Sequence, residues 1–182
     1  MGMERLRNEA AALKYIKSNT NIPVPTLRCA FEDNGRFYVT TDVVSGVAMA
    51  KLSTEQKLIV MKEIKVHLQT MQGIKSSIMG GLLGDGGLPY RLSKAIPHAK
   101  PITFKQAETP EFVFCHNDLS QHNILVDEDT LMVTAIIDWE YAGFYPKEFE
   151  GAFYKRPGPS VALDGEEDDV PYLLGVLEQW ML

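Results

Sequence analysis

The first 45 residues carry a helical pattern followed by a strand pattern. Between residues 3 and 18, apolar side chains recur at helical spacing, at Leu6, Ala10, Leu13 and Ile16. Two β-prone runs follow, residues 27–31 and 37–43, and the sequence Asp-Asn-Gly at 33–35 between them is a strong signal for a hairpin turn. The sequence therefore predicts one helix and one β-hairpin in this part of the chain.

A second helix is predicted from residue 53 to about residue 71. Ser53 and Gln56 have the spacing of a capping box, which closes the first turn of a helix. Five apolar side chains are expected to line the buried face of this helix, namely Leu58, Met61, Ile64, Leu68 and Met71. The glycine-rich stretch 80–87 lacks the G-x-G-x-x-G order of a phosphate-binding loop, so it and the proline-rich stretch 88–113 are predicted to be loops.

A hairpin is also predicted between residues 124 and 137. Two apolar runs, 124–126 and 131–137, flank a short acidic turn. Because a hairpin returns the chain to its starting end, we expect Asn123 and Asp138 to face one another at its open end. Asp118 lies five residues before Asn123, in a polar loop that can cross the same end.

These three oxygen-bearing side chains suit a phosphoryl-transfer site. Carboxylate and amide oxygens are the ligands that Mg²⁺ prefers, and phosphoryl transfer depends on positioning and on neutralising the phosphate charge. The alternative is a loop in which Asp and Asn only cap turns. That alternative is the better explanation of an isolated Asp-x-x-x-x-Asn, whereas the ordered set of His116, Asp118, Asn123, hairpin and Asp138 favours the phosphoryl-transfer site.

His116-x-Asp118-x-x-x-x-Asn123, followed by Ile137-Asp138, resembles the catalytic and metal-binding loops of the aminoglycoside phosphotransferase and choline kinase-like family. These proteins are small-molecule kinases built on the protein-kinase fold, and the sequence Asp-Trp-Glu-x-Ala-Gly at 138–143 is typical of fungal members. The resemblance implies that Asp118 is the base that positions the acceptor hydroxyl. It implies that Asn123 and Asp138 hold Mg²⁺ against the phosphates of ATP, and that His116 braces the loop.

The same resemblance implies an α+β, protein-kinase-like fold in one domain, 1–182. Residues 1–45 would be a truncated small lobe of helix plus β-hairpin, and residues 46–182 a mainly helical large lobe that contains the catalytic-loop hairpin. Asp42 and Val44 would offer main-chain groups to adenine. Glu9 falls where a helix glutamate pairs with a phosphate-binding lysine, although an ordinary solvated glutamate is an equal alternative. Residues 145–150 are expected to anchor the catalytic loop to the large lobe.

A complete family member begins with three strands that carry a phosphate-covering loop and the lysine. The sequence given begins at the helix that follows them, so we interpret it as N-terminally truncated, with weakened nucleotide binding and rate. Three interpretations stay open: a Mg²⁺- and ATP-dependent kinase of an unidentified small molecule, a degenerate relative that binds nucleotide or protein without turnover, and a truncated gene product. The strand 37–43 would have an open edge, which predicts a homodimer through this edge or disorder of residues 1–45.

Composition limits the size of the domain and the classes of partner, but it does not indicate a function. A chain of 182 residues can form one domain with a real core or two small lobes, but not two full domains. The net charge of −6 argues against a nucleic-acid partner. Cys29 and Cys115 form no disulfide framework, and no run is long enough to span a membrane, so a cytoplasmic protein is expected.

The acidic run 166–169 has two interpretations. Such a run often precedes a helix, and Pro171 at the first helical position supports a last helix that reaches about residue 182. The alternative is that these acids recruit a cationic acceptor.

Overall fold

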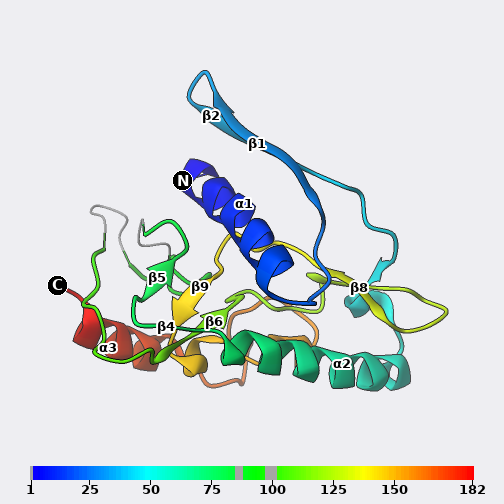
Figure 1. Cartoon of the computed structure of the whole chain (residues 1–182). Coiled ribbons are helices and arrows are strands. Elements are labelled where there is room, and N and C mark those ends of the chain that lie inside the picture. The colour runs from blue at the N-terminus through cyan, green and yellow to red at the C-terminus, as the bar shows by residue number, and fades with distance from the viewer. Residues whose placement is uncertain (1, 85–87, 97–101) are drawn as a thin grey trace.

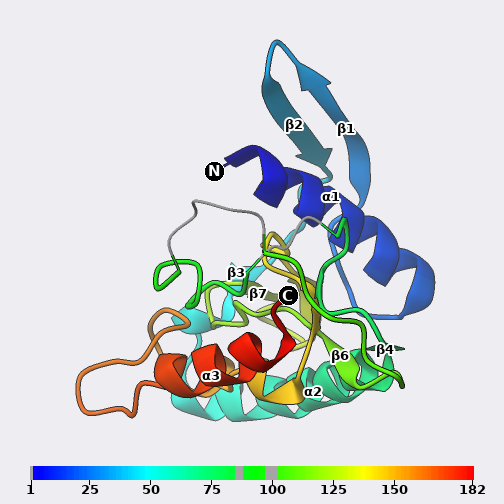
Figure 2. The same cartoon turned by 90° about the vertical axis from the view of Figure 1, so that its left-hand side faces the viewer.

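Helix α1 (Gly2–Asn19) and the hairpin of β1 (Leu27–Asp33) and β2 (Arg36–Thr41) form the N-terminal part of the computed structural model, which describes residues 2–84, 88–96 and 102–182. The hairpin turns at Asn34 and Gly35, whose φ angles of 48° and 71° are the positive values that a two-residue turn requires. The predicted helix and hairpin are therefore confirmed. The hairpin projects away from the rest of the molecule, with α1 between them (Figures 1 and 2).

Two small antiparallel sheets form the remainder together with α2 (Thr54–Gly73) and α3 (Val170–Trp180). The first sheet has the order β3-β7-β8 and contains β3 (Val47–Ala48), β7 (Ile124–Val126) and β8 (Val133–Ile136). The second has the order β4-β6-β9-β5 and contains β4 (Lys75–Ser76), β6 (Phe112–Cys115), β9 (Gly143–Tyr145) and β5 (Gly80–Gly81). Among the described residues, single-turn 3-10 helices occur at η1 (Met49–Lys51), η2 (Lys147–Phe149) and η3 (Phe153–Lys155).

Strands β7 and β8 form the hairpin predicted around the acidic turn. Ile124 pairs with Ile136, so the residues just outside the hairpin, Asn123 and Ile137, are brought together at its open end. The amide of Ile137 donates to the carbonyl of Asn123 at 3.0 Å. This contact joins the two segments that carry the candidate metal ligands.

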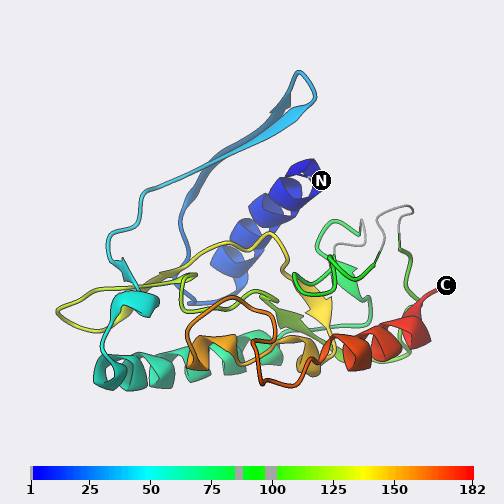
Figure 3. The same ribbon diagram turned by 180° about the vertical axis from the view of Figure 1, so that it is seen from behind.

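Helices α2 and α3 lie on the side of the molecule away from the β1–β2 hairpin (Figure 3). The capping box of α2 is confirmed: the Gln56 amide donates to the Ser53 hydroxyl at 3.3 Å, and the Ser53 amide donates to the Gln56 side chain at 2.9 Å. The predicted buried face is wrong at Leu58, which is 58% exposed. At 3.6 residues per turn Leu58 lies about 120° around the helix from Ile64, whereas Val60 takes the buried position.

The core consists of two clusters of buried side chains. The larger lies between α1, α2 and the three-stranded sheet and includes Ile16, Ile64 and Trp139. The smaller packs beneath α3 and includes Phe112 and Tyr145. Strand β6 supplies buried side chains to both clusters, so the segment that carries Asp118, which follows β6, starts where the two clusters meet.

Residues 46–182 are less helical than predicted. Between α2 and α3 the described chain consists of short strands, turns and single 3-10 turns, because this stretch is rich in glycine and proline and has no helical periodicity. Part of the expected glycine-rich loop is strand β5, which pairs with β9; residues 85–87 lie outside the described residues. In the described part of the chain, no helix is both long and apolar enough to cross a bilayer.

The β1–β2 hairpin is a sheet of two strands, and no other described strand pairs with it. Its inner side contacts α1, where the guanidinium of Arg7 pairs with Glu32. On its outer side the rings of Phe31 and Tyr38 stack with centroids 5.2 Å apart, although both side chains are largely exposed. The open strand edge expected from the sequence is thus present, while the homodimer through it stays a prediction.

Candidate active site

His116 connects the segment that carries Asp118 to the segment that carries Asp138. Its buried ring donates from Nε2 to the carbonyl of Ile137 at 3.0 Å and accepts at Nδ1 from the amide of Asp118 at 3.2 Å. Burial lowers the pKa of His116 to about 4, so the ring is neutral and keeps one donor and one acceptor nitrogen. This geometry agrees with the bracing role expected for His116.

Asn123 bonds directly to Asp118. Its Nδ2 donates to the Asp118 carbonyl at 2.8 Å and lies 3.4 Å from the Asp118 carboxylate. These bonds fix the orientation of the side-chain amide and leave its oxygen, Oδ1, to act as a ligand for a cation. The structure therefore brings Asp118 and Asn123 together, as the sequence predicted.

Asp138 follows β8 at the same end of the hairpin. Its φ of 64° places it in the left-handed region, which aspartate tolerates better than most residues and which turns the chain sharply out of the strand. Trp139 is fully buried behind it and donates from its indole nitrogen to the carbonyl of Ile136 at 2.8 Å. The buried indole anchors the turn from which the Asp138 carboxylate projects.

The site is strongly acidic. Burial raises the pKa of Asp118 to about 6, and the nearby charge of Asp138 adds to the shift. Burial also raises the pKa of Glu9 to about 7, with further contributions from Asp138 and Glu140. Carboxylates whose pKa is raised by burial and by a neighbouring negative charge are stabilised by a cation placed among them. The electrostatics of the site therefore favour a bound cation.

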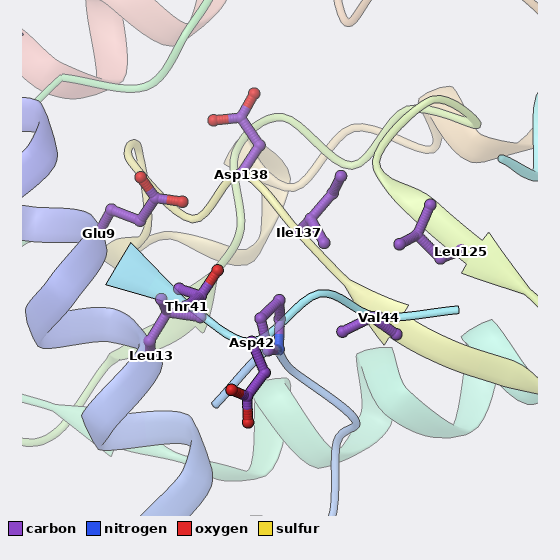
Figure 4. A pocket seen from close by; sticks show the side chains of 9 residues that line it. Glu9, Leu13, Thr41, Asp42, Val44, Leu125, Ile137 and Asp138 are labelled. Atoms are coloured by element: carbon purple, nitrogen blue, oxygen red, sulfur yellow. The ribbon is translucent and has the colours of Figure 1, made fainter. Parts of the chain in front are cut away.

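A cavity of about 340 Å³ lies beside Asp138. Glu9 and Leu13 reach it from α1, and Ile137 and Leu125 form another wall (Figure 4). Pro25, Thr41, Asp42 and Val44 complete the lining. The cavity thus joins an apolar compartment to a carboxylate-bearing end, the combination that a planar base attached to a metal-bound phosphate chain requires.

Asp42 and Val44 both line this cavity, as expected for the segment that meets adenine. The amide of Asp42 is already bonded to the carbonyl of Thr26 at 2.9 Å, and its carboxylate pairs with Arg28. The main-chain group that Asp42 still offers is its carbonyl. An adenine ring in this cavity would therefore meet a hydrogen-bond acceptor, the carbonyl of Asp42, and the main chain of Val44.

The donor set fits a magnesium ion held jointly with a substrate. Among residues 2–84, 88–96 and 102–182, no three His, Cys, Asp or Glu side chains converge into a metal cage. Mg²⁺ is usually bound by one or two carboxylate or amide oxygens, with water and phosphate oxygens completing its octahedron. Asn123 and Asp138 can supply that small protein share.

Glu150 anchors the loop that carries Asp118, in agreement with the anchoring role expected for residues 145–150. Its carboxylate accepts hydrogen bonds from the amides of His116 and, at 3.2 Å, Asn117. Burial raises the pKa of Glu150 to about 7 despite these bonds. The sequence identified the segment but gave no signal that this carboxylate would be the contact.

Two further residues near the site, Asn8 and Asn117, were not singled out from the sequence. Both are buried asparagines that bond to the main chain of the segment after Asp138. An asparagine at helical spacing from the apolar residues Ala12 and Ile16 is a signal in the sequence that could have drawn attention to Asn8.

The acidic run 166–169 is partly committed to internal contacts. Glu166 pairs with Arg156 at 2.6 Å, and Asp169 pairs with the buried Arg91 at 2.9 Å. Asp168 accepts from the amide of Val170 at 3.0 Å, at the start of α3. These contacts agree with the interpretation as a helix start, and recruitment of a cationic acceptor by this run stays a prediction.

Comparison with known proteins relates the chain to small-molecule kinases. A family model described as a phosphotransferase enzyme family matches residues 86–154, which include Asp118, Asn123 and Asp138. Two proteins of Arabidopsis thaliana, probable choline kinase 3 and probable choline kinase 1, are 50% and 48% identical over 40 residues. Each alignment covers 22% of this chain and 11% of the relative.

Similar solved structures are aminoglycoside phosphotransferases. Aminoglycoside phosphotransferase APH(4)-Ia superposes with a TM-score of 0.57 at 16% identity, over 82% of this chain and 60% of that one. An aminoglycoside-3'-phosphotransferase of type VIII gives a TM-score of 0.54 at 19% identity, over 79% and 60%. A ternary complex of an APH(4)-Ia mutant with ADP and hygromycin B also matches, with a TM-score of 0.56 at 15% identity over 78% and 59% of the two chains. The likeness establishes a shared fold, and the chain spans about six-tenths of the length of these structures.

Proposed function

Because this chain belongs to the aminoglycoside phosphotransferase and choline kinase-like family, we propose that it transfers the terminal phosphoryl group of ATP, with Mg²⁺, to a hydroxyl group of a small molecule. The observation that carries the proposal is the convergence of Asp118, Asn123 and the Asp138 segment. The side chain of Asn123 donates to Asp118, and its main-chain carbonyl accepts from the amide of Ile137. Assignment to the fungal members, and residence in the cytoplasm, stay predictions.

Asp118 is the base of the proposed reaction. Its carboxylate has a pKa of about 6, so it is mainly ionised at neutral pH and can accept the proton of an incoming hydroxyl. The oxygen of that hydroxyl forms the new bond to phosphorus while the bond to the leaving ADP oxygen breaks. His116, bonded to the amide of Asp118, holds the carboxylate-bearing loop in place.

Asn123 and Asp138 are the proposed protein ligands of Mg²⁺. A bound Mg²⁺ neutralises charge on the phosphate oxygens and thereby lowers the barrier to transfer. The cavity between Glu9 and Leu125 takes the nucleotide, with the adenine ring beside the carbonyl of Asp42 and the main chain of Val44. The phosphates then lie at the Asp138 end.

Isothermal titration calorimetry with ATP, run with and without Mg²⁺, tests this proposal. The wild-type protein should bind ATP more tightly with Mg²⁺ than without it, and Asp138→Ala should remove most of that difference. Asp129→Ala is a matched control, because Asp129 is an exposed carboxylate in the turn of the same hairpin. Identical metal dependence in the wild type and in Asp138→Ala would contradict the proposal.

A second candidate function, nucleotide binding without turnover, is favoured by the charges around Glu9. The charged groups that shift its pKa are the carboxylates Asp138 and Glu140, and no lysine or arginine lines the described cavity. Phosphate oxygens are held less firmly without a cation at that position. Mg²⁺-dependent ATP binding without ADP formation, over a panel of small hydroxyl compounds, would select this second function.

A further inference from the structure

The main chain that follows Asp138 is fixed by two buried asparagines from distant parts of the chain. Asn8, on α1, donates from Nδ2 to the carbonyls of Glu140 at 3.1 Å and Ala142 at 2.8 Å. Asn117, on the catalytic loop, donates from Nδ2 to the intervening carbonyl of Tyr141 at 2.9 Å. Three consecutive carbonyls are thus held by two side-chain amides from distant parts of the chain.

Asn8 is placed as a connector rather than as an ordinary helix residue. It is 3% exposed, and its Oδ1 accepts a further hydrogen bond from the amide of Leu82 at 3.0 Å. Burying an amide is unfavourable unless it is hydrogen-bonded, and here both N–H groups and the oxygen have partners. The side chain therefore joins α1, the segment after Asp138 and the stretch at residue 82.

Asn117 is equally constrained. It is 1% exposed and has a φ of 66°, a left-handed conformation that asparagine adopts more readily than most residues. Its Oδ1 has no partner among the residues that the structure describes, so the need of the Tyr141 carbonyl for a donor decides the orientation of the amide. Its main-chain amide donates to the carboxylate of Glu150, which ties the residue to the segment 145–150.

Each asparagine directly precedes a carboxylate of the site. Asn8 precedes Glu9, which lines the cavity, and Asn117 precedes Asp118. Arg5, one helical turn before Asn8, adds an outer contact by donating to the Glu140 carboxylate at 2.7 Å and to the Tyr141 hydroxyl at 2.6 Å. The position of Asp138 relative to Asp118 and Glu9 therefore depends on contacts made by their immediate neighbours.

We propose that Asn8 and Asn117 form a clamp that positions Asp138 against Asp118 and Glu9, and that the clamp thereby determines how much Mg²⁺ tightens ATP binding. Both are positioning residues, since they act through the main chain after Asp138. The second half of the proposal rests on the proposed function. The first half concerns the segment 138–143 alone and can be tested without any ligand.

Two variants, Asn8→Ala and Asn117→Ala, are to be compared with Asn19→Ala. Asn19 is on the same helix as Asn8, but its side chain bonds locally to the carbonyl of Tyr15, so its loss leaves the clamp intact. Hydrogen exchange followed by mass spectrometry reports the protection of residues 138–143. Calorimetry gives the ratio of ATP dissociation constants without and with Mg²⁺.

Each clamp variant should accelerate exchange in 138–143 while the rest of α1 and α2 keeps its protection. Each should also reduce the Mg²⁺-dependent ratio at least tenfold, with the affinity for metal-free ATP changed much less. Asn19→Ala should match the wild type in both measurements. Unchanged exchange in folded variants would overturn the clamp, and faster exchange with an unchanged ratio would reduce the two residues to structural stabilisers.

The two proposals can fail separately. If the wild-type protein does not bind ATP, the proposed function fails, and the exchange of 138–143 alone then decides the clamp. If the variants do not fold, the wild-type protein still gives an answer by NMR. The Nδ2 protons of Asn8 and Asn117 should exchange with solvent far more slowly than those of Asn19, and fast exchange would overturn the clamp.

Discussion

At the scale of single residues, Asp118 is the side chain whose loss should separate binding from chemistry. Asp118→Asn preserves the shape of the side chain and its contact with Asn123. Because an amide cannot accept the proton of the acceptor hydroxyl, we expect transfer to fall by about 10²–10⁴-fold while the dissociation constant of Mg·ATP stays nearly unchanged. The measurement is ADP formation with any acceptor that supports turnover, beside calorimetry of the same preparation. A rate close to that of the wild type would remove Asp118 from the role of base.

Glu150 should make the folded protein less stable as the pH rises. Burial raises its pKa from about 4.5 to about 7, so between these values the folded chain keeps a proton that the unfolded chain has released. The stabilising contribution is therefore complete below pH 4.5 and is lost as the pH rises through 7. Its size is on the order of 3 kcal/mol.

Glu150→Gln isolates this effect, because the amide oxygen can still accept from the amides of His116 and Asn117. We expect the fall in unfolding free energy between pH 5 and pH 8 to be smaller in the variant by about 2 kcal/mol. Urea denaturation at the two pH values measures it. Equal pH dependence in both proteins would show that this carboxyl keeps an ordinary pKa.

At the scale of elements, the pairing of β5 with β9 depends on a close approach of two glycines. A Cβ atom at Gly143 would lie 2.4 Å from the carbonyl oxygen of Gly80, so alanine cannot fit without moving a strand. Gly143→Ala should therefore lower the unfolding free energy by roughly 1–3 kcal/mol. Gly175→Ala, in the exposed middle of α3 with open space around it, should instead raise it by up to about 1 kcal/mol.

Thermal and urea denaturation of these two variants measure both shifts. Because the chemical change is the same in each, opposite signs would show that the close backbone approach is responsible. A Gly143→Ala variant as stable as the wild type would contradict the pairing of β5 with β9. Such a variant would also place the end of the Asp138 segment elsewhere, since Gly143 is the residue at which that segment enters β9.

Elements with local signals could be predicted from the sequence. The turn at Asn34 and Gly35 and the capping box at Ser53 are each decided by residues within four positions of one another. The hairpin that brings Asn123 beside Ile137 follows from two apolar runs and the turn between them. For this reason the segments that carry the candidate ligands were correctly brought together.

Features decided by distant contacts could not be predicted in this way. Strand β5 exists because Gly80 and Gly81 meet β9, more than sixty residues later in the chain. The hydrogen bonds of Asn8 reach partners that lie 74 to 134 residues further along the chain, and no local pattern identifies those partners. Leu58 was misplaced because its face of α2 depends on where the sheet lies, not on hydrophobicity alone.

At the scale of the whole molecule, the candidate site joins two parts of the chain. Glu9, Asp42 and Val44 come from the N-terminal helix and the segment after the β1–β2 hairpin, whereas Asp118, Asn123 and Asp138 come from the loop after β6 and from the open end of the β7–β8 hairpin. Any movement of α1 would therefore change the distance between the proposed nucleotide and metal positions. The amide bonds of Asn8 and the contacts of Arg5 hold these parts together.

The open edge of β2 should let the protein self-associate. An exposed strand edge offers unpaired N–H and C=O groups to a second strand, and a two-stranded hairpin gains stability from such an addition. The pair that flanks a two-residue turn, here Asp33 and Arg36, is hydrogen-bonded, so the alternating N–H groups of Phe37 and Val39 face the open edge. We expect the protein to form a homodimer by pairing β2 with β2 of a second copy.

Val39→Pro removes one of those edge N–H groups without removing a bond between β1 and β2, so it should shift the protein from dimer towards monomer. Val39→Thr keeps the N–H group at the same position and should leave the dimer intact. Sedimentation velocity over a range of protein concentrations distinguishes the two states. A wild-type protein that sediments as a monomer at every concentration, or a Val39→Pro variant that dimerises as the wild type does, would show that the edge stays bare or is covered by something other than a second copy.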